Sequence, residues 1–176
     1  MKKLSIVLVI AAAALLVSAP AKAADMGVGI NWLGNGQDLM VLPIKMESGL
    51  ILEPMAGFQI VKDGNKYFDF GARIEKHSKS DGITPLFGAF GLFEYTKFPD
   101  ATTLIAATGD PKKSVIDFSL GVYVGGSVPV SEKFDVVGSW GPEVDILTSR
   151  FEGGKSSTVF RSQASLVLRW WLWGEK

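Results

Sequence analysis

The segment "STVFRSQASLVLRWWLW", residues 157–173, decides the fold because it places two arginines inside an otherwise apolar stretch. Side chains of an extended strand point alternately to opposite faces. The even positions read Thr, Phe, Ser, Ala, Leu, Leu, Trp and Leu, whereas the odd positions include Arg161 and Arg169. The segment therefore predicts a strand with one apolar face and one largely polar face.

The same alternation recurs in seven further segments, so eight strands are expected in all. They span residues 26–32, 39–46, 50–61, 67–76, 86–97, 114–128 and 134–148. Turn-forming stretches such as "GNGQD", "KDGN", "PVSEK" and "EGGKS" separate them, and only the connection 98–113 is long. After the first 23 residues no helical periodicity of useful length is found. The chain is predicted to be all-β, an antiparallel up-and-down barrel.

Two features of the sequence depart from regular strand alternation. The segment 86–97 carries apolar residues on both faces, so the pattern does not assign its inner and outer sides. Pro43, Pro54 and Pro142 lie inside predicted strands, where proline removes a hydrogen-bond donor from the ladder. Each of the three therefore predicts a bulge.

Residues 1–23 have the composition of a secretory signal peptide. Lys2 and Lys3 precede an apolar run at 4–17, and Ala21 and Ala23 form a small-residue cleavage site. A retained membrane anchor is the alternative, but the run is shorter than the ~20 apolar residues that a spanning helix needs. Cleavage would leave residues 24–176 as a single domain.

Composition excludes several kinds of function. Removal of the predicted signal peptide leaves 15 basic and 18 acidic residues, a net charge near −3, which does not favour a nucleic-acid partner. The chain has no cysteine and one histidine, so neither disulfides nor a metal cluster is expected. No cofactor is predicted.

Alternation alone is compatible with two opposite barrels. A soluble lipocalin-like barrel encloses an apolar ligand, whereas an outer-membrane barrel turns its apolar face to lipid. An eight-stranded barrel is only wide enough inside for side chains or one small ligand, and the aromatic residues here would overfill it. The transmembrane barrel is therefore favoured. Its predicted lipid-facing residues are Phe58, Phe68, Phe70, Phe118, Trp140, Phe160, Leu166, Leu168 and Trp170.

The polar face combines small residues with charges of both signs, which suits a narrow interior. Enclosed charges must be paired and hydrogen-bonded, because an unpaired buried charge costs several kcal/mol. Glu143 is a reasonable partner for Arg161, since the seventh and eighth strands are neighbours. The predicted lumen charges are Lys45, Glu53, Asp69, Arg73, Glu75, Asp117, Asp135, Glu143, Asp145, Arg161 and Arg169.

Aromatic residues fall near both predicted rims, as in the two interfacial belts of a membrane barrel. The alternative is that they fill a core. One belt comprises Trp32, Tyr95, Phe98, Phe151 and Phe160, and the other comprises Phe134, Trp170 and Trp173.

With these features the mature region 24–176 resembles the small eight-stranded outer-membrane barrels of Gram-negative bacteria, the opacity-protein and outer-membrane-protein-A-like superfamily. The most family-like part is 114–148, where two long alternating strands flank the tight turn "PVSEKF". The resemblance implies a cell outer membrane location, periplasmic termini and insertion by the barrel-assembly machinery. It also implies that 98–113 faces outward, where its "TTLIAAT" stretch either contacts a surface ligand or folds onto the barrel mouth.

Some eight-stranded barrels are enzymes that act on lipid A with a histidine, a serine and an acid. The histidine here is His77, with Ser78 and Ser80 beside it, but Lys79 occupies the serine position of the deacylases' His-x-Ser element. His77 is expected to be a solvated turn residue, and the chain is predicted not to be an enzyme. An open porin is not expected either, because side chains fill so narrow a barrel. A structural or surface-interaction role remains.

Overall fold

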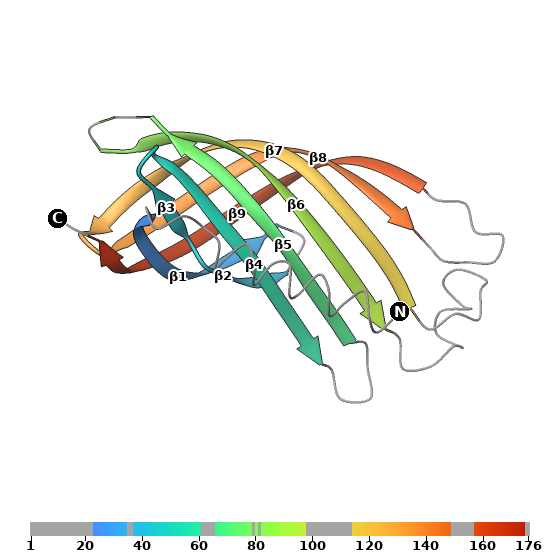
Figure 1. Ribbon diagram of the computed structural model, residues 1–176. Helices are drawn as coiled ribbons and strands as arrows, with labels where there is room; N and C mark the ends of the chain where they lie inside the picture. Colours follow the sequence, from blue (N-terminus) through green and yellow to red (C-terminus); the bar gives the residue numbers. More distant parts are fainter. Residues whose placement is uncertain are drawn as a thin grey trace.

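Nine strand segments close into an eight-stranded antiparallel barrel, because β2 and β3 are two halves of one strand (Figure 1). In this computed structural model the described residues are 23–34, 37–60, 66–78, 80, 82–97, 114–148 and 157–174. The strands are β1 Ala23–Leu33, β2 Asp38–Val41, β3 Ile44–Met46, β4 Leu50–Ile60, β5 Lys66–His77, β6 Thr84–Lys97, β7 Ser114–Ser131, β8 Phe134–Thr148 and β9 Ser157–Gly174.

Sequence neighbours pair along the whole sheet, and β1 pairs with β9 to close it. The closing ladder runs from Asp25 opposite Gly174 to Leu33 opposite Ser165. Closure matters because it leaves no sheet edge with unpaired backbone groups. Among the described residues no helix is long and apolar enough to cross a membrane. The predicted eight-stranded all-β barrel is confirmed.

The two ends of the barrel differ in their connections. The connections β3–β4, β5–β6 and β7–β8 lie at one end, together with the last described residue (Figure 1). We call this the turn end; it includes Gly49, whose φ of +77° is a left-handed conformation that favours glycine. The opposite end, where β4, β6 and β8 finish, is called the loop end. The connection 98–113, which was predicted to face outward and to contact a surface ligand or fold onto the barrel mouth, lies outside the described residues.

The three prolines behave differently from the prediction. The strand is interrupted at Leu42 and Pro43, but the register is the same on both sides of Pro43, Pro54 and Pro142, so the predicted bulges at these three positions are wrong. The Pro54 carbonyl accepts a hydrogen bond from Leu42 N, so its missing N–H falls on the side where β2 and β3 are interrupted. Likewise the β7–β8 ladder skips the residues opposite Gly141 and Pro142. The missing N–H of a proline thus interrupts the hydrogen-bonded ladder without the extra residue that a bulge would insert.

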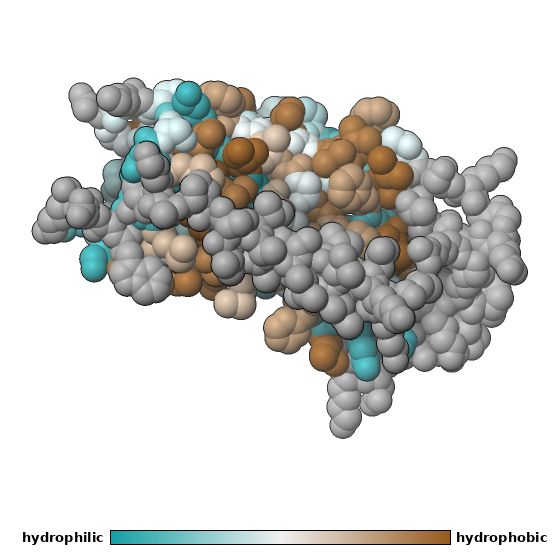
Figure 2. Space-filling view, viewed as in Figure 1, coloured by the Kyte–Doolittle hydropathy of each residue, from teal (hydrophilic) through white to brown (hydrophobic). Residues whose placement is uncertain are grey.

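Burial follows the alternation along each strand. In β4, Ile51, Glu53, Met55 and Gly57 are buried, while the intervening Ala56 and Phe58 are exposed. In β7, Phe118, Leu120, Val122, Val124 and Val128 are exposed large hydrophobic residues. Figure 2 shows hydrophobic side chains spread over the visible outer face. The buried faces of the strands point into the barrel and the exposed apolar faces point away from it.

Pairing also settles the two sides of β6. Phe93 lies opposite Phe70 on one side and Phe118 on the other, and the Phe70 and Phe93 rings are 4.7 Å apart. Phe93 therefore shares the outer face with Phe87. Leu92 belongs to a cluster of buried apolar residues that includes Leu33 and Met55, and Phe90 packs against this cluster. The residues of β6 that alternate with Phe87 and Phe93 therefore face inward.

Candidate functional site: the barrel interior

Four charged side chains from three strands meet in the middle of the barrel interior. Glu53 of β4, Arg73 and Glu75 of β5, and Arg169 of β9 are each at most 3% exposed. We call these four residues the ion quartet. Two cations and two anions make it formally neutral, which is what so complete a burial requires.

Arg169 joins opposite sides of the barrel through this quartet. Its Nε lies 2.6 Å from Glu53 Oε1 and its Nη2 lies 2.6 Å from Glu75 Oε1. Arg73 completes the ring, with Nε 3.4 Å from Glu53 Oε2 and Nη2 3.3 Å from Glu75 Oε2. Because β9 and β4 are separated by β1 and the β2–β3 pair, the contacts span the interior rather than one ladder. The quartet therefore acts as a cross-brace.

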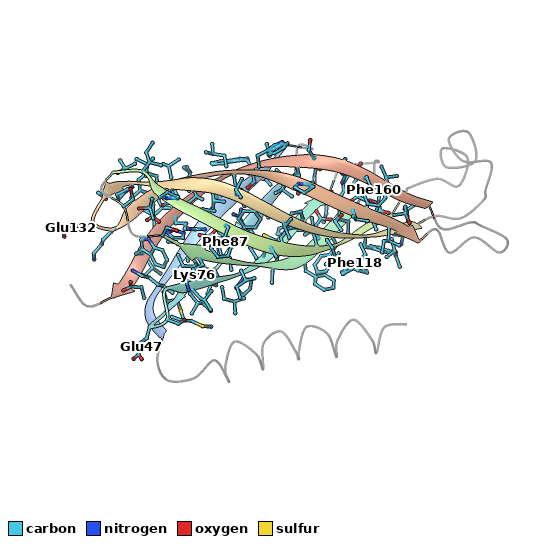
Figure 3. All side chains as sticks on the ribbon, turned by 90° about the horizontal axis from the view of Figure 1, so that it is seen from above. Glu47, Lys76, Phe87, Phe118, Glu132 and Phe160 are labelled. Carbon is cyan, nitrogen blue, oxygen red and sulfur yellow. The ribbon has the colours of Figure 1, made fainter. Side chains whose placement is uncertain are left out.

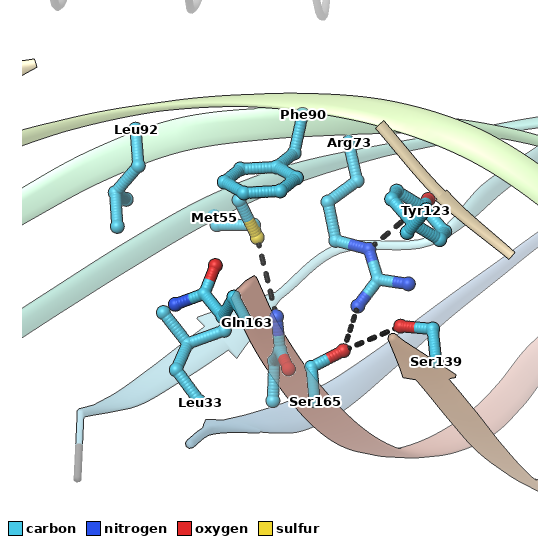
Figure 4. Close-up of a pocket in the computed structure, with 10 residues that line it drawn as sticks. Leu33, Met55, Arg73, Phe90, Leu92, Tyr123, Ser139, Gln163 and Ser165 are labelled. Atoms are coloured by element: carbon cyan, nitrogen blue, oxygen red, sulfur yellow. Dashed lines mark hydrogen bonds between the residues drawn. The ribbon is translucent and has the colours of Figure 1, made fainter. Parts of the chain in front are cut away.

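A hydroxyl network extends the quartet toward the loop end (Figure 4). Arg73 donates to Tyr123 Oη at 3.2 Å and to Ser165 Oγ at 3.0 Å, and Ser165 Oγ is 2.7 Å from Ser139 Oγ. The Arg73 guanidinium also lies over the Tyr123 ring, 4.5 Å from its centroid. Tyr123 Oη in turn donates to Glu75 Oε2 at 3.2 Å. The contacts with Tyr123 and Ser165 hold the Arg73 side chain in place, and Glu75 and Ser139 in turn hold those two hydroxyl groups.

Beyond this network the interior becomes apolar. A cavity of about 20 Å³ has Leu33, Met55, Phe90 and Leu92 on its apolar side (Figure 4). The rest of its wall is polar and consists of Asn31, Gln163 and the network residues Arg73, Tyr123, Ser139 and Ser165. That volume is close to the space of one water molecule and far below that of a drug-sized ligand. The sequence pattern did not predict this apolar layer, since it assigned the polar face to charges and small residues alone.

Toward the loop end, acids outnumber bases among the described residues. Asp69, Glu94, Asp117, Glu143 and Asp145 form this acidic cluster. Arg161 Nε lies 2.8 Å from Glu143 Oε1 and 2.7 Å from Asp145 Oδ2. Asp145 also accepts a hydrogen bond from Ser119 at 2.6 Å, and Glu94 accepts one from Gln37. The predicted balance of signs does not hold at this end of the described structure.

The pair of Arg161 with Glu143 was suggested by sequence, and the register places the two residues directly opposite each other. The Arg161 side chain is nevertheless 42% exposed. Alternation predicts an enclosed Arg161 side chain, like that of Arg169. Arg161 lies nearer the open end of its strand, and position along the strand explains the difference.

At the turn end the barrel opens into a polar vestibule of about 1460 Å³. Lys45 lies here, 47% exposed and 3.2 Å from Asp25, so it borders the vestibule rather than the enclosed interior. Asp135, also a predicted lumen charge, accepts a hydrogen bond from Trp171 Nε1. Thr84 and Ser127 add hydroxyl groups to the wall. The vestibule is connected to the ion quartet through His77, which lines it and contacts Glu75.

His77 also lines the vestibule and differs from its prediction. It is the last residue of β5, and its Nε2 is 2.6 Å from Glu75 Oε1, with the side chain 20% exposed. The expectation of a solvated turn residue is therefore wrong. The alternation that places Glu75 inward places His77 two residues later on the same face.

The predicted lipid-facing residues lie on the outer faces of their strands. Phe160 is 79% exposed and Trp140 is 58% exposed. Phe118 and Phe160 project near the loop end in Figure 3. Phe70 and Leu168 are half-buried, and the Phe70 ring packs 4.7 Å from that of Phe93. At the turn end Phe134 and Trp170 are cross-strand partners with rings 4.7 Å apart. Phe98 and Phe151, and the side chain of Trp173, lie outside the described structure.

Buried polar residues outside the predicted set also belong to the interior. Asn31, Ser127 and Tyr123 are at most 5% exposed, and Asn31 Nδ2 contacts Met55 Sδ at 3.5 Å. The alternation already placed Tyr123 on the polar face, but an aromatic ring gave no reason to expect an arginine partner. In the part of the chain that the structure describes, no group of three or more His, Asp or Glu side chains is placed to hold a metal ion.

Comparison with known proteins identifies the fold. No protein-family model matches the chain, and no curated protein matches it in sequence. Among solved structures, the crystal structure of Neisserial surface protein A is similar, with a TM-score of 0.50 and 15% sequence identity over 83% of this chain and 92% of that one. At that identity the similarity concerns the fold. The chain thus shares its eight-stranded barrel architecture with a known surface protein.

Proposed function

We propose that this chain is an integral protein of the Gram-negative outer membrane with a closed, charge-braced interior and a structural or surface-interaction role. The observation that carries the proposal is the inverted polarity of the barrel. Glu53 and Arg169 are fully buried inside, while Phe58 and Phe160 are more than three-quarters exposed outside. Soluble monomers rarely expose apolar patches larger than a few hundred Å². Hydrocarbon is the solvent that accommodates such an outer face.

The similarity to a neisserial surface protein supports this proposal, since that barrel has the same architecture. The proposed function does not include an enzymatic activity. His77 is hydrogen-bonded to Glu75, which itself contacts both arginines of the ion quartet. This arrangement supports a structural role for His77, because its partner Glu75 is already paired with both arginines of the neutral ion quartet.

A lipocalin-like carrier is the competing function. Such a carrier needs an apolar cavity that encloses its ligand, and the cavity beside Met55 and Phe90 is about 20 Å³. The vestibule is larger, but its wall carries Lys45, His77 and Asp135 and it opens at one end. These observations favour the membrane protein.

Cell fractionation tests the proposal directly. We expect the full-length chain, expressed in a Gram-negative host, to sediment with outer-membrane fractions and to migrate differently on a gel before and after boiling. An intact barrel keeps its hydrogen-bonded closure in mild detergent, whereas heat opens it. Release of the chain by osmotic shock, with no mobility change on boiling, would contradict the proposal and favour the soluble carrier.

A pair of arginine substitutions on β7 tests which solvent covers the outer face. Val122 and Val130 are exposed residues of the same strand, 57% and 61% exposed. Val122 lies mid-strand, whereas Val130 borders the turn end, at the register shift between Pro129 and Ser131. In a bilayer Val122→Arg is expected to destabilise the barrel by about 2–4 kcal/mol and Val130→Arg by about 0–1 kcal/mol. Urea titration of the chain refolded in lipid vesicles measures both.

Equal effects of the two substitutions would contradict a lipid-covered face. In water both arginines would sit on an exposed surface, and each would change stability by less than about 0.5 kcal/mol. The nearly equal exposure of the two valines makes Val130→Arg a matched control for the added charge.

A further inference from the structure

We propose that the outer rim of the loop end binds the phosphate group of an outer-leaflet glycolipid between Lys66 and Lys97. This inference rests on the proposed membrane location. It adds a specific ligand-binding site to a surface that otherwise contacts acyl chains without selectivity.

The two lysines face each other on adjacent strands. Lys66 begins β5 and Lys97 ends β6, and the two are direct cross-strand partners. Both are exposed. Side chains of directly opposed residues start from Cβ atoms roughly 4.5–5.5 Å apart, and like charges in this position destabilise a sheet. An anion between the ammonium groups would relieve that repulsion.

Their side of the sheet is the outer one. Lys97 follows Phe93 and Tyr95 at intervals of two residues, and Lys66 precedes Phe68 in the same way. The nearest carboxylates on these strands, Asp69 and Glu94, are partners of each other on the inner face. Among the described residues neither lysine has an ion-pair partner. The positive charge of the rim is therefore not neutralised by the barrel wall next to it.

Apolar rows lie directly below the lysines, toward mid-barrel. Two residues along the strands toward mid-barrel, the next outward-facing cross-strand row consists of Phe58, Phe68, Tyr95 and Ile116. The row after that contains Phe70 and Phe93, whose rings are 4.7 Å apart, and the Phe68 ring is 6.0 Å from that of Phe70. Phe58 is 77% exposed and Ile60, beside Lys66, is 68% exposed. A pair of cations thus borders a broad apolar face.

This order of groups matches a phosphorylated lipid. Ammonium groups form strong charge-assisted hydrogen bonds with phosphate oxygens, while the acyl chains below the phosphate meet the aromatic rows. In the proposed orientation the loop end faces outward, so the lipid belongs to the outer leaflet. A free phosphate ion would use the lysines but not Phe58, Phe68 or Tyr95.

Lipid retention provides the test. The full chain is inserted into phosphatidylcholine vesicles doped with bis-phosphorylated lipid A or with the same lipid A after dephosphorylation, and bound lipid is counted by native mass spectrometry. We expect retention of the phosphorylated form to exceed that of the dephosphorylated form by at least about tenfold, as two charge-assisted contacts allow. Lys66→Gln/Lys97→Gln is expected to abolish the preference, and Lys66→Arg/Lys97→Arg to preserve it.

Lys76→Gln/Lys133→Gln is the matched control, because it removes two exposed lysines from the opposite end of the barrel. It should leave the preference unchanged, and millimolar inorganic phosphate should not displace the lipid. Equal retention of both lipids, a preference that survives Lys66→Gln/Lys97→Gln, its loss in the control or in the arginine variant, or displacement by inorganic phosphate would each overturn the site. A wild-type chain that fails to insert contradicts the proposed function instead, and heat-modifiable gel mobility reports insertion separately.

Discussion

Replacing Arg169 with alanine will destabilise the barrel by about 3–5 kcal/mol, the usual effect of breaking a fully buried ion pair. Arg169 is 0% exposed and contacts Glu53 and Glu75 at 2.6 Å each. Without it, two buried carboxylates share the single cation of Arg73 within the quartet. Urea titration of the refolded chain, followed by gel mobility and by circular dichroism, measures the loss.

Two variants separate charge from volume in this experiment. Arg169→Met keeps much of the side-chain volume and should lose nearly as much stability as Arg169→Ala, because the carboxylates are equally unpaired. Adding Glu53→Gln to Arg169→Met leaves Arg73 with Glu75, a neutral pair. That double variant is expected to recover most of the lost stability.

Lys45→Ala is the control for loss of a cation from an ion pair. Lys45 and Asp25 are 3.2 Å apart, with side chains 47% and 21% exposed. A solvated pair of this kind contributes about 0–1 kcal/mol. If Arg169→Ala and Lys45→Ala had similar effects, the interior would be hydrated rather than closed, and the cross-brace would have no structural role.

The strands were predictable because their signal is local. Alternation over 134–148 reproduces β8 residue for residue, and the segment 157–173 differs from β9 by one residue. The inner and outer sides of β6 were not predictable, because both faces of 86–97 are apolar. The pairing of Phe93 with Phe70 and Phe118, together with the burial of Leu92, settles them.

The grouping of the interior charges could not be predicted from alternation. Arg169 and Glu53 are 116 residues apart, and their contact depends on strand register, strand tilt and the closing β1–β9 ladder together. The Arg161–Glu143 pair was accessible to sequence reasoning because β8 and β9 are consecutive. Alternation predicts whether a residue faces the interior. Its position along the barrel axis determines whether it belongs to the ion quartet, the apolar layer or the acidic cluster, and alternation does not give that position.

Gly141→Ala is expected to be among the most damaging of small substitutions, destabilising the barrel by about 3 kcal/mol through backbone displacement. A Cβ at Gly141 would lie 1.9 Å from the Val122 carbonyl oxygen and 2.6 Å from Tyr123 Cα. Both obstacles are backbone atoms of β7, so no rotamer change relieves the overlap. The β7–β8 ladder is already interrupted here, beside Pro142, so displacement of β8 would widen an existing gap in the pairing.

Gly138→Ala, three residues earlier on the same strand, is the matched control. A Cβ there meets no heavy atom within 4 Å, because Gly138 faces outward. Alanine at that position should leave stability unchanged or raise it slightly, since glycine has more conformational entropy to lose on folding. Refolding yield and urea midpoint, measured side by side, separate the two variants. Comparable loss in both would show that β8 requires glycine for flexibility, and would contradict close approach of β7 as the reason for Gly141.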